Sequence, residues 1–365
     1  YVFRDWLYRA LIFLVISCPC ALVISIPLGY FGGLGAASKN GILFKGASYL
    51  DEMTKVNTVV MDKTGTVTKG VFKIKEIKAI VWKEPEFMKY LMAMEEQSTH
   101  PIAKAIMDYK ADGEDFQASE VSEIAGKGLK GTVNGKSVLV GNKPLMISNS
   151  IEVPSETDNI VESIVMVSIE GKFAGYVIIA DELKDDAHEA IKQIRESGIS
   201  KIIMLSGDKD SITQQVAKEM GIDTAKGGLL PEDKLNEVEK LMSENDGRVA
   251  FIGDGINDAV AMAEADVGIA VCGGADIAVQ SADVVMLQPG LDVIIDLISL
   301  SQKTRMIIRQ NLGWAFIYNL LAIPLAAGLF VNLGVSLTPM LAAGIMATSS
   351  ILVVLNSLRL SRISL

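Results

Sequence analysis

Hydrophobic and polar positions divide the chain into two apolar ends and a polar middle. Residues 10–38 contain no charged side chain, and this stretch is longer than the roughly 20 apolar residues that cross a bilayer as a helix. Residues 310–358 are also free of charge, which is enough for two passes, and the break at 331–334 suits a short connecting loop. The pattern therefore predicts three transmembrane α-helices.

Basic residues flank these apolar stretches. Lys303, Arg305 and Arg309 precede the second predicted crossing, and Arg359 and Arg362 follow the third. Lysine and arginine are enriched on the cytoplasmic side of membrane helices. The sequence thus predicts an integral, multi-pass protein of the cell membrane whose polar middle lies in the cytoplasm.

The polar middle contains short β-branched runs that each end at a small or acidic residue, at 58–61, 202–205 and 249–252. Such runs are typical of buried parallel strands, and they alternate with helical patterns at 185–197 and 208–220. We therefore expect a doubly wound, Rossmann-type α/β sheet that binds its ligands at the carboxyl ends of its strands. In residues 72–174, an early helical pattern is followed by short strands with alternating polarity, which predicts an inserted α+β domain.

Composition limits the classes of function. The chain is 50% hydrophobic and carries a formal net charge of -10, which is typical of a mixed membrane and cytoplasmic protein. The acidic balance excludes a nucleic-acid partner, because phosphate contacts need a dense basic cluster. Three cysteines are too few for a disulfide framework. Cys18 and Cys20 are expected to be poorly placed to pair with each other, which favours a role as thiol ligands.

The strongest chemical signals follow the predicted strands. Asp62 stands directly after the first run, where a sharp turn lets backbone N–H groups hold a phosphate, and this is a nucleophile position. A parallel sheet brings Ser206, Lys234 and Asp254 to the same edge. Phosphoryl transfer to a carboxylate needs a hydroxyl donor, a cation and a Mg²⁺ held by hard oxygen ligands, and these three residues fit those roles.

Two motifs contain these residues, DKTGT at 62–66 and GDGIND at 253–258, and through them the chain resembles the P-type ATPases. The resemblance implies a haloacid-dehalogenase-like phosphorylation domain that uses ATP and forms a phosphoaspartate at Asp62. The implied Mg²⁺ ligands are Asp62, the Thr64 carbonyl, Asp254 and Asp258. The implied catalytic residues are Asp62, Lys63, Thr64, Ser206, Gly207, Asp208, Lys234, Asn257 and Asp258, of which the last two order their loop.

Two alternatives from other classes remain open. Soluble haloacid-dehalogenase-type phosphatases share this sheet edge, but they commonly carry a second acid two residues after the nucleophile, which protonates the leaving group. That position is Thr64 here, so the phosphoenzyme is expected to persist, which favours a pump over a membrane-anchored phosphatase. The other alternative is a nucleotide-regulated, metal-binding membrane module without catalysis.

The inserted domain holds a set of residues that resembles the nucleotide-binding signature of the heavy-metal subgroup of these ATPases: Glu95, His100, Pro101, Gly126, Gly128, Gly141 and Asn142. Gly126 and Gly128 can let the backbone approach a planar ring or a phosphate, and His100 and Glu95 can contact adenine. Taken alone, His100 followed by Pro101 is typical of a helix start. The prediction of an ATP site therefore rests on the set as a whole.

Cys18-Pro19-Cys20 lies in the middle of the first predicted crossing. Pro19 removes a backbone hydrogen bond there, so the helix is expected to open locally and to turn both thiols toward an internal cavity. The motif resembles the ion site of the heavy-metal subgroup, which implies that Cys18 and Cys20 bind the transported ion.

The identity of the ion depends on the other two predicted crossings, which contain no charge to balance a divalent ion. They offer the neutral residues Tyr318, Asn319, Met346 and Ser350, and the thioether of Met346 suits Cu(I). This set resembles the copper-exporting branch, whereas the zinc and cadmium branch carries Lys and Asp in the corresponding helices. Residues 21–27 look closer to the zinc and cadmium relatives, so Zn²⁺ or Cd²⁺ is the alternative.

The resemblance implies five regions: a membrane helix with Cys-Pro-Cys at 1–38, a phosphorylation domain at 39–71 and 175–309, a nucleotide-binding domain at 72–174, and two membrane helices within 310–365. It covers only the later part of a full pump, so we expect upstream helices and an actuator loop to be missing and the isolated chain to complete no transport cycle. The implied partners are ATP, the metal ion, a metallochaperone that delivers it, and membrane lipid.

Overall fold

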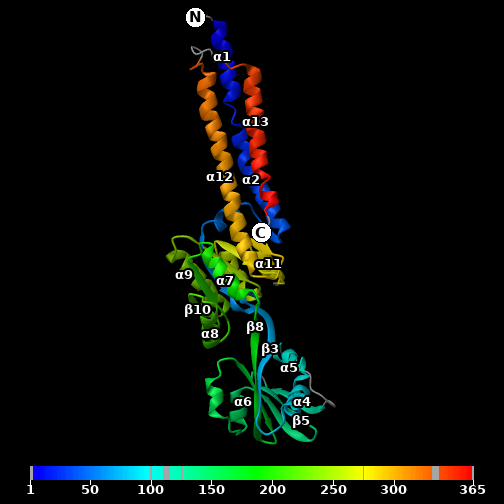
Figure 1. The fold of residues 1–365 in the computed structure, drawn as a ribbon. Helices are drawn as coiled ribbons and strands as arrows, with labels where there is room; N and C mark the ends of the chain where they lie inside the picture. The colour runs from blue at the N-terminus through cyan, green and yellow to red at the C-terminus, as the bar shows by residue number, and fades with distance from the viewer. Residues whose placement is uncertain are drawn as a thin grey trace.

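The computed structural model describes residues 3–98, 101–109, 116–124, 126–273, 275–330 and 337–363. These residues form an elongated molecule in which a bundle of long helices, a central α/β domain and a distal α+β domain follow one another (Figure 1). The apolar ends of the chain meet in the bundle, and the polar middle folds into the two domains.

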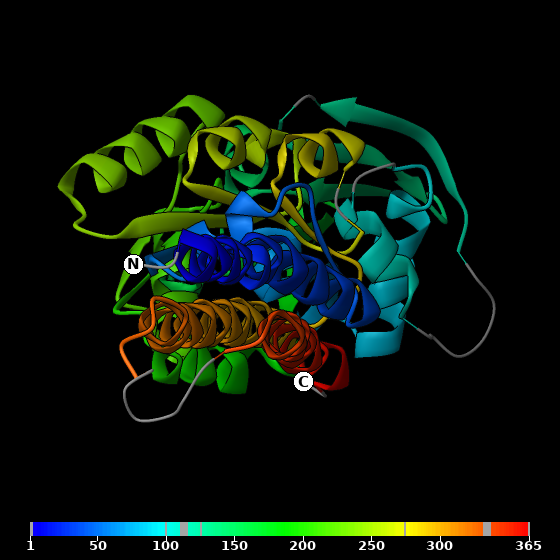
Figure 2. The ribbon, with the colours of Figure 1, turned by 90° about the horizontal axis from the view of Figure 1, so that it is seen from above.

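The bundle consists of α1 (Phe3–Ile16), α2 (Cys20–Lys39), α12 (Asp292–Ala326) and α13 (Pro339–Ser357). Viewed along the bundle, α1 and α2 lie end to end beside α12 and α13 (Figure 2). Of the described residues, two stretches are long and apolar enough to cross a membrane, Phe3–Lys39 and Pro339–Arg362. The remaining predicted crossing falls on the second half of α12, and it stays a prediction.

The central domain is built on a seven-stranded sheet in the order β1-β13-β12-β11-β2-β9-β10. All neighbouring strands are parallel except β1 and β13. The strands are β1 (Ile42–Phe44), β2 (Val56–Asp62), β9 (Lys201–Leu205), β10 (Thr224–Lys226), β11 (Arg248–Gly253), β12 (Val267–Ala270) and β13 (Val284–Met286). Because β2 lies between β9 and β11, the three predicted strands are neighbours and their carboxyl ends meet at one edge.

Helices cover both faces of this sheet, which confirms the predicted doubly wound α/β fold. One face packs against α3 (Ser48–Met53), α7 (Ala187–Glu196), α8 (Asp210–Met220) and the start of α12. The other face packs against α9 (Pro231–Glu244), α10 (Ala259–Glu264) and α11 (Asp276–Ser281). Short helical turns stand at η1 (Lys63–Val67), η2 (Ser155–Asn159), η3 (Ile256–Asp258) and η5 (Leu360–Arg362).

The distal domain is an antiparallel sheet in the order β3-β8-β7-β6-β5-β4. Its strands are β3 (Thr68–Ala79), β4 (Ala118–Ile124), β5 (Gly128–Val133), β6 (Lys136–Gly141), β7 (Ser163–Ile169) and β8 (Lys172–Leu183), and its helices are α4 (Glu84–Glu95), α5 (Pro101–Met107) and α6 (Lys143–Ser148). Paired strands β3 and β8 run from one domain into the other (Figure 1). They connect the predicted inserted domain to the edge of the central sheet that carries Asp62.

Candidate active site

A buried ion-pair cluster lies at the carboxyl end of β2. The Nζ atom of Lys234 lies 2.6 Å from Oδ1 of Asp62 and 2.7 Å from Oδ1 of Asp258. All three side chains are buried, with 6% of Asp62, 4% of Lys234 and 2% of Asp258 exposed. Lys234 reaches this position from the first turn of α9, which starts with Pro231 at a position where its missing N–H costs no hydrogen bond.

Three carboxylates at this edge lie close enough together to share one cation. One oxygen each from Asp62, Asp254 and Asp258 can be chosen so that all three atoms lie within 4.8 Å of one another. Carboxylate oxygens are the hard ligands that Mg²⁺ prefers, so the residues fit that ion. The structure therefore brings together three of the four predicted Mg²⁺ ligands, and Thr64, whose carbonyl is the fourth, lies two residues beyond Asp62 in η1.

The pKa values of the ionisable groups in this cluster are shifted by burial and by the neighbouring charges. Burial, and then the charge of Asp258, raise the pKa of Asp62 to about 7, although Lys234 acts in the opposite direction. Burial and Asp258 also raise the pKa of Asp254. Burial lowers the pKa of Lys234, but Asp62 and Asp258 together outweigh it, so the net direction is upward and the amine stays charged.

The turn after Asp62 contains a glycine in a conformation that favours this residue. Gly65 has a φ of +72°, and a Cβ on it would lie 1.7 Å from Oδ2 of Asp254. At the next residue, the hydroxyl of Thr66 is buried and has no hydrogen-bond partner in the described part of the chain. A buried hydroxyl without a partner is costly, and a phosphate oxygen at this turn would satisfy it.

Ser206 and Asp208 stand at the end of β9, next to β2. The Ser206 hydroxyl accepts a hydrogen bond from the backbone N–H of Asp208 at 3.1 Å, and the side chain of Ser206 is buried. Lys63 Nζ lies 2.5 Å from Oδ2 of Asp208, so an ion pair joins the turn after Asp62 to this loop. Gly207 is exposed at the same turn. Asn257, in η3 after β11, is also exposed, so it lies outside the buried ion-pair cluster.

Sequence reasoning missed Thr68 and Asp181. The Thr68 hydroxyl donates to Oδ2 of Asp181 at 2.5 Å and accepts from the N–H of Gly65 at 3.3 Å, so this pair holds the turn in place. Burial raises the pKa of Asp181, and its other oxygen has no partner among the described residues. Asp181 follows an apolar run in β8, the same signal that identified Asp62, and that signal could have found it.

The predicted nucleotide residues line a cavity of about 330 Å³ in the distal domain, and those present there are Glu95, Gly126, Gly128, Gly141 and Asn142. Burial raises the pKa of Glu95. A Cβ on Gly126 would meet no atom within 4 Å, so its backbone is open to a ligand. His100 lies outside the described residues, and Pro101 begins α5.

At two of these positions, backbone packing alone requires glycine. Gly128 and Gly141 face each other across β5 and β6, and a Cβ on Gly128 would lie 2.1 Å from the carbonyl oxygen of Val140. Asn142 caps α6 by accepting from the N–H of Leu145 at 3.1 Å. These three positions therefore shape the cavity wall whether or not they touch a ligand.

A larger cavity of about 490 Å³ lies between the two domains and connects both halves of the site. Its wall includes Lys63 and Asp208 from the central domain, Asp181 from β8, and Ile102 from α5. Ile102 also lines the distal cavity, so the two cavities share a wall. An extended ligand could thus reach from Glu95 toward the nucleophile.

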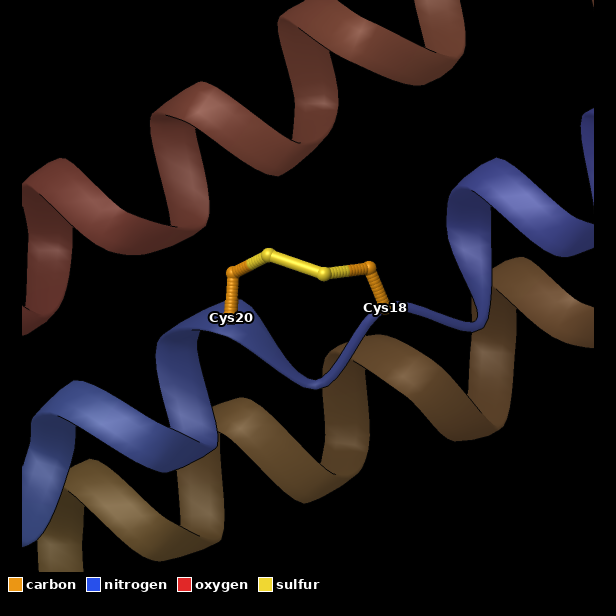
Figure 3. The surroundings of a disulfide bond; sticks show 2 residues. All are labelled: Cys18 and Cys20. Carbon is orange, nitrogen blue, oxygen red and sulfur yellow. A yellow bond between two sulfur atoms is a disulfide. The ribbon is translucent and has the colours of Figure 1, made fainter.

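The Cys-Pro-Cys segment separates α1 from α2, as the missing N–H of Pro19 predicts. The expectation that Cys18 and Cys20 would be poorly placed to pair is wrong: they form a disulfide, shown in Figure 3. In an unbroken helix, residues two positions apart point to opposite sides, whereas the open backbone at Pro19 lets the two side chains turn toward each other, with the Cα atoms 5.4 Å apart, within the range that disulfides require. Reduction to thiols is therefore a condition for any role of this pair as ligands.

The other predicted ion ligands lie on the helices beside this break. Ala21, Ala315 and Val353 pack together, so Cys18, Asn319 and Ser350 stand about one helical turn from that contact in a common direction. The hydroxyl of Tyr318 and Oδ1 of Asn319 are buried and lack partners in the described ranges. Met346 is half-buried and lies a further turn along α13.

Comparison with known proteins adds independent information. A model of the haloacid dehalogenase-like hydrolase family matches residues 56–266. A zinc-transporting ATPase of Synechocystis is 42% identical over 351 residues, which are 93% of this chain and 48% of that protein. A copper-exporting P-type ATPase of Staphylococcus saprophyticus is 38% identical over 376 aligned residues, which cover 100% of this chain and 45% of that protein.

Among solved structures, a zinc-transporting PIB-type ATPase crystallised in its E2.Pi state matches with a TM-score of 0.84 and 32% identity. The match covers 99% of this chain and 59% of the other. The chain spans about half the length of the curated relatives that it matches.

Proposed function

Because the chain belongs to the haloacid dehalogenase-like hydrolases and is homologous over nearly its whole length to the heavy-metal P-type ATPases, we propose that it phosphorylates itself from ATP to drive metal-ion export. The cell membrane holds its helices in this proposal, and both domains lie in the cytoplasm. A metallochaperone delivers the ion. The buried contact between Asp62 and Lys234 carries the catalytic part of the proposal.

The transfer proceeds by attack of an Asp62 oxygen on the terminal phosphorus of ATP, with ADP as the leaving group. Lys234 neutralises negative charge next to the attacking oxygen, and the Ser206 and Thr66 hydroxyls are placed to donate to phosphate oxygens. When bound by Asp62, Asp254 and Asp258, Mg²⁺ supplies further charge neutralisation. Thr64 offers no carboxylic acid to promote hydrolysis, so the phosphoenzyme persists.

Trapping of the phosphoenzyme tests this function. ATP labelled at the γ-phosphate is expected to leave an acid-stable, hydroxylamine-labile label on the chain, and Asp62→Asn is expected to abolish it. Asp276→Asn is a matched control at the start of α11, outside the cluster, and should keep the label. Rapid release of phosphate without a trapped label would indicate the phosphatase alternative, and ATP binding without label or release would indicate the non-catalytic module.

For the ion, the proposal is Cu(I), bound by reduced Cys18 and Cys20 together with Asn319 and Met346. The support is chemical: the helices beside the cysteines offer a soft thioether and neutral oxygens, and the uncharged set suits a monovalent soft ion. Met346→Ala is expected to weaken Cu(I) binding at least about 100-fold, since loss of a direct ligand costs more than loss of an outer partner, whereas Met340→Ala on the exposed start of α13 leaves it unchanged.

Zn²⁺ is the second candidate, and one observation favours it. The zinc-transporting relative from Synechocystis is more similar to this chain, at 42% identity, than the copper-exporting relative from Staphylococcus saprophyticus, at 38%. Titration of the reduced chain with each ion distinguishes the two. Stoichiometric binding of Zn²⁺ that is insensitive to Met346→Ala would overturn the copper proposal and leave the phosphorylation proposal intact.

A further inference from the structure

A cavity whose wall consists of polar and charged residues and one methionine lies where α12 leaves the central domain and enters the helix bundle. Its volume is about 400 Å³, and none of its residues belongs to the phosphorylation, nucleotide or ion sites. Five of its six wall residues come from one side of α12 and the sixth from the segment after α3, and the wall consists of Thr54, Gln302, Arg305, Met306, Arg309 and Gln310.

The two arginines of this cavity have no carboxylate partner among the described residues. Arg305 donates to the hydroxyl of Thr54 at 2.7 Å, and the guanidinium of Arg309 has no hydrogen bond or ion pair with any residue of the described ranges. Both acidic residues of the neighbouring helix α3 are engaged elsewhere, because Asp51 accepts from Tyr30 and Glu52 pairs with Lys55 and Arg248. The cavity therefore presents two guanidinium groups that form no ion pair within the described part of the chain.

The position of the cavity along α12 matches the polar edge of a bilayer. Trp314 and Phe316, which are 62% and 67% exposed, follow Arg309 on the same helix and begin an apolar surface. At 1.5 Å per residue, Arg309 lies about 8 Å and Arg305 about 14 Å before Trp314. Tryptophan marks the interface of a membrane, and arginine extends from there toward headgroups.

We propose that Arg305 and Arg309 bind the phosphate of an anionic phospholipid from the cytoplasmic leaflet. Two guanidinium groups four residues apart on a helix present donors from one face, and guanidinium matches phosphate oxygens with paired hydrogen bonds. Thr54 holds Arg305 against the central domain, so the bound lipid would touch both that domain and the membrane helix. This site is independent of the phosphorylation chemistry.

Binding of fluorescent phosphatidylglycerol to the full chain in neutral detergent tests the proposal. The double variant Arg305→Gln/Arg309→Gln is expected to lose about 25-fold in affinity, about fivefold for each charge. Lys303→Gln/Arg362→Gln is the matched control, since it removes the same charge at the same end of the bundle but from outside the cavity wall. Because Arg305→Gln also removes the contact with Thr54, single Arg309→Gln provides a variant whose fold should be unchanged.

The source of the phosphate is tested in the same assay. Phosphatidylcholine, which has a phosphate but no net charge, is expected to bind weakly, and free glycerol phosphate should compete only at far higher concentration because it lacks the acyl chains that Met306 and the apolar surface contact. An equal loss in the control double variant would show unspecific charge attraction and overturn the proposal. Equal binding of phosphatidylcholine, or no loss in folded Arg309→Gln, would also overturn it, and tight binding of glycerol phosphate would indicate a soluble ligand instead.

Discussion

Gly65 and Asp254 approach each other so closely that only a hydrogen atom fits between them: a Cβ on Gly65 would lie 1.7 Å from Oδ2 of Asp254. Gly65 also has a φ of +72°, a conformation that other residues adopt at a cost. The turn after Asp62 and the loop that carries Asp254 are thus packed against each other at a residue without a side chain. This contact sets the distance between Asp62 and the other carboxylates.

Gly65→Ala is therefore expected to abolish phosphorylation while the fold persists. The backbone strain alone costs about 1–2 kcal/mol, and the new Cβ must also push Asp254 away from the cation site. We expect phosphoenzyme formation to fall by at least about 100-fold, a loss typical of a displaced electrostatic group, and Mg²⁺ dependence to shift to higher concentration. Labelling with γ-labelled ATP over a range of Mg²⁺ concentrations measures both.

Gly70→Ala is a control that introduces backbone strain without the steric clash that Gly65→Ala creates with Asp254. Gly70 has a φ of +66°, but a Cβ there would have its nearest neighbour, the Cα of Gly65, at 3.7 Å, an ordinary contact. This control should lose stability without losing the Mg²⁺ response. If Gly70→Ala and Gly65→Ala reduced labelling equally, the close approach to Asp254 would not be the cause.

Lys234→Met is predicted to destabilise the chain and to prevent phosphorylation. Methionine keeps much of the volume, but Asp62 and Asp258 then share a buried site without a cation. Removal of one partner from a buried ion pair typically costs about 3–5 kcal/mol. Thermal unfolding without Mg²⁺ measures this loss, and addition of Mg²⁺ should recover part of it. Lys240→Met on the exposed side of α9 should change neither unfolding nor labelling.

The sheet and the position of its site could be predicted because each signal was local. A buried strand that ends in an acidic residue can be recognised from five or six residues of sequence, and the carboxyl ends of parallel strands lie at one edge of the sheet. Asp62 and Asp254 followed from this rule. Lys234 could be predicted only from its motif and its place in a loop, because the hydrophobic pattern does not indicate that the first turn of α9 faces β2.

Contacts that depend on two distant segments could not be predicted. The pairing of Thr68 with Asp181 joins residues 113 positions apart, and their hydrogen bond exists only because β3 and β8 run side by side. The resemblance implies that Gly128 and Gly141 belong to a nucleotide site, but their mutual approach across β5 and β6 already requires glycine. The disulfide could not be predicted because it depends on the break at Pro19, which redirects two side chains that would point to opposite sides of an unbroken helix.

Stability is predicted to fall between about pH 4 and pH 7 in the absence of Mg²⁺. The pKa of Asp62 is about 7 in the folded chain, mainly because of burial, and about 4 in an unfolded one. The folded chain therefore binds more protons in this window, so its stability is greatest at low pH and decreases as pH rises through the folded pKa. Asp62→Asn removes this contribution and should be more stable than the unmodified chain at pH 8, with the difference vanishing toward pH 4.

Melting temperatures of both chains across this range provide the measurement. Mg²⁺ is expected to stabilise the unmodified chain at pH 8 more than Asp62→Asn, because the ion favours the ionised carboxylate. A larger gain in stability with rising pH for the unmodified chain than for the variant would contradict the assigned direction. Asp276→Asn, at the start of α11, serves as the charge-matched control.

Reduction is predicted to switch ion binding on. In the disulfide, Cys18 and Cys20 have no thiolate to offer, so the oxidised chain is expected to bind neither Cu(I) nor Zn²⁺ in the bundle. After reduction, one ion per chain should bind, and Cys18→Ser or Cys20→Ser should weaken it by at least about 100-fold, since a lost first ligand costs more than the 10- to 100-fold of an outer partner. Cys272→Ser provides the matched control, because Cys272 is the exposed free cysteine of the central domain, and its loss should leave the stoichiometry unchanged. Ion titration of thiol-reduced and diamide-oxidised chains, with free thiols counted in parallel, decides the matter: equal binding by both forms would show that the ion does not use these two sulfur atoms.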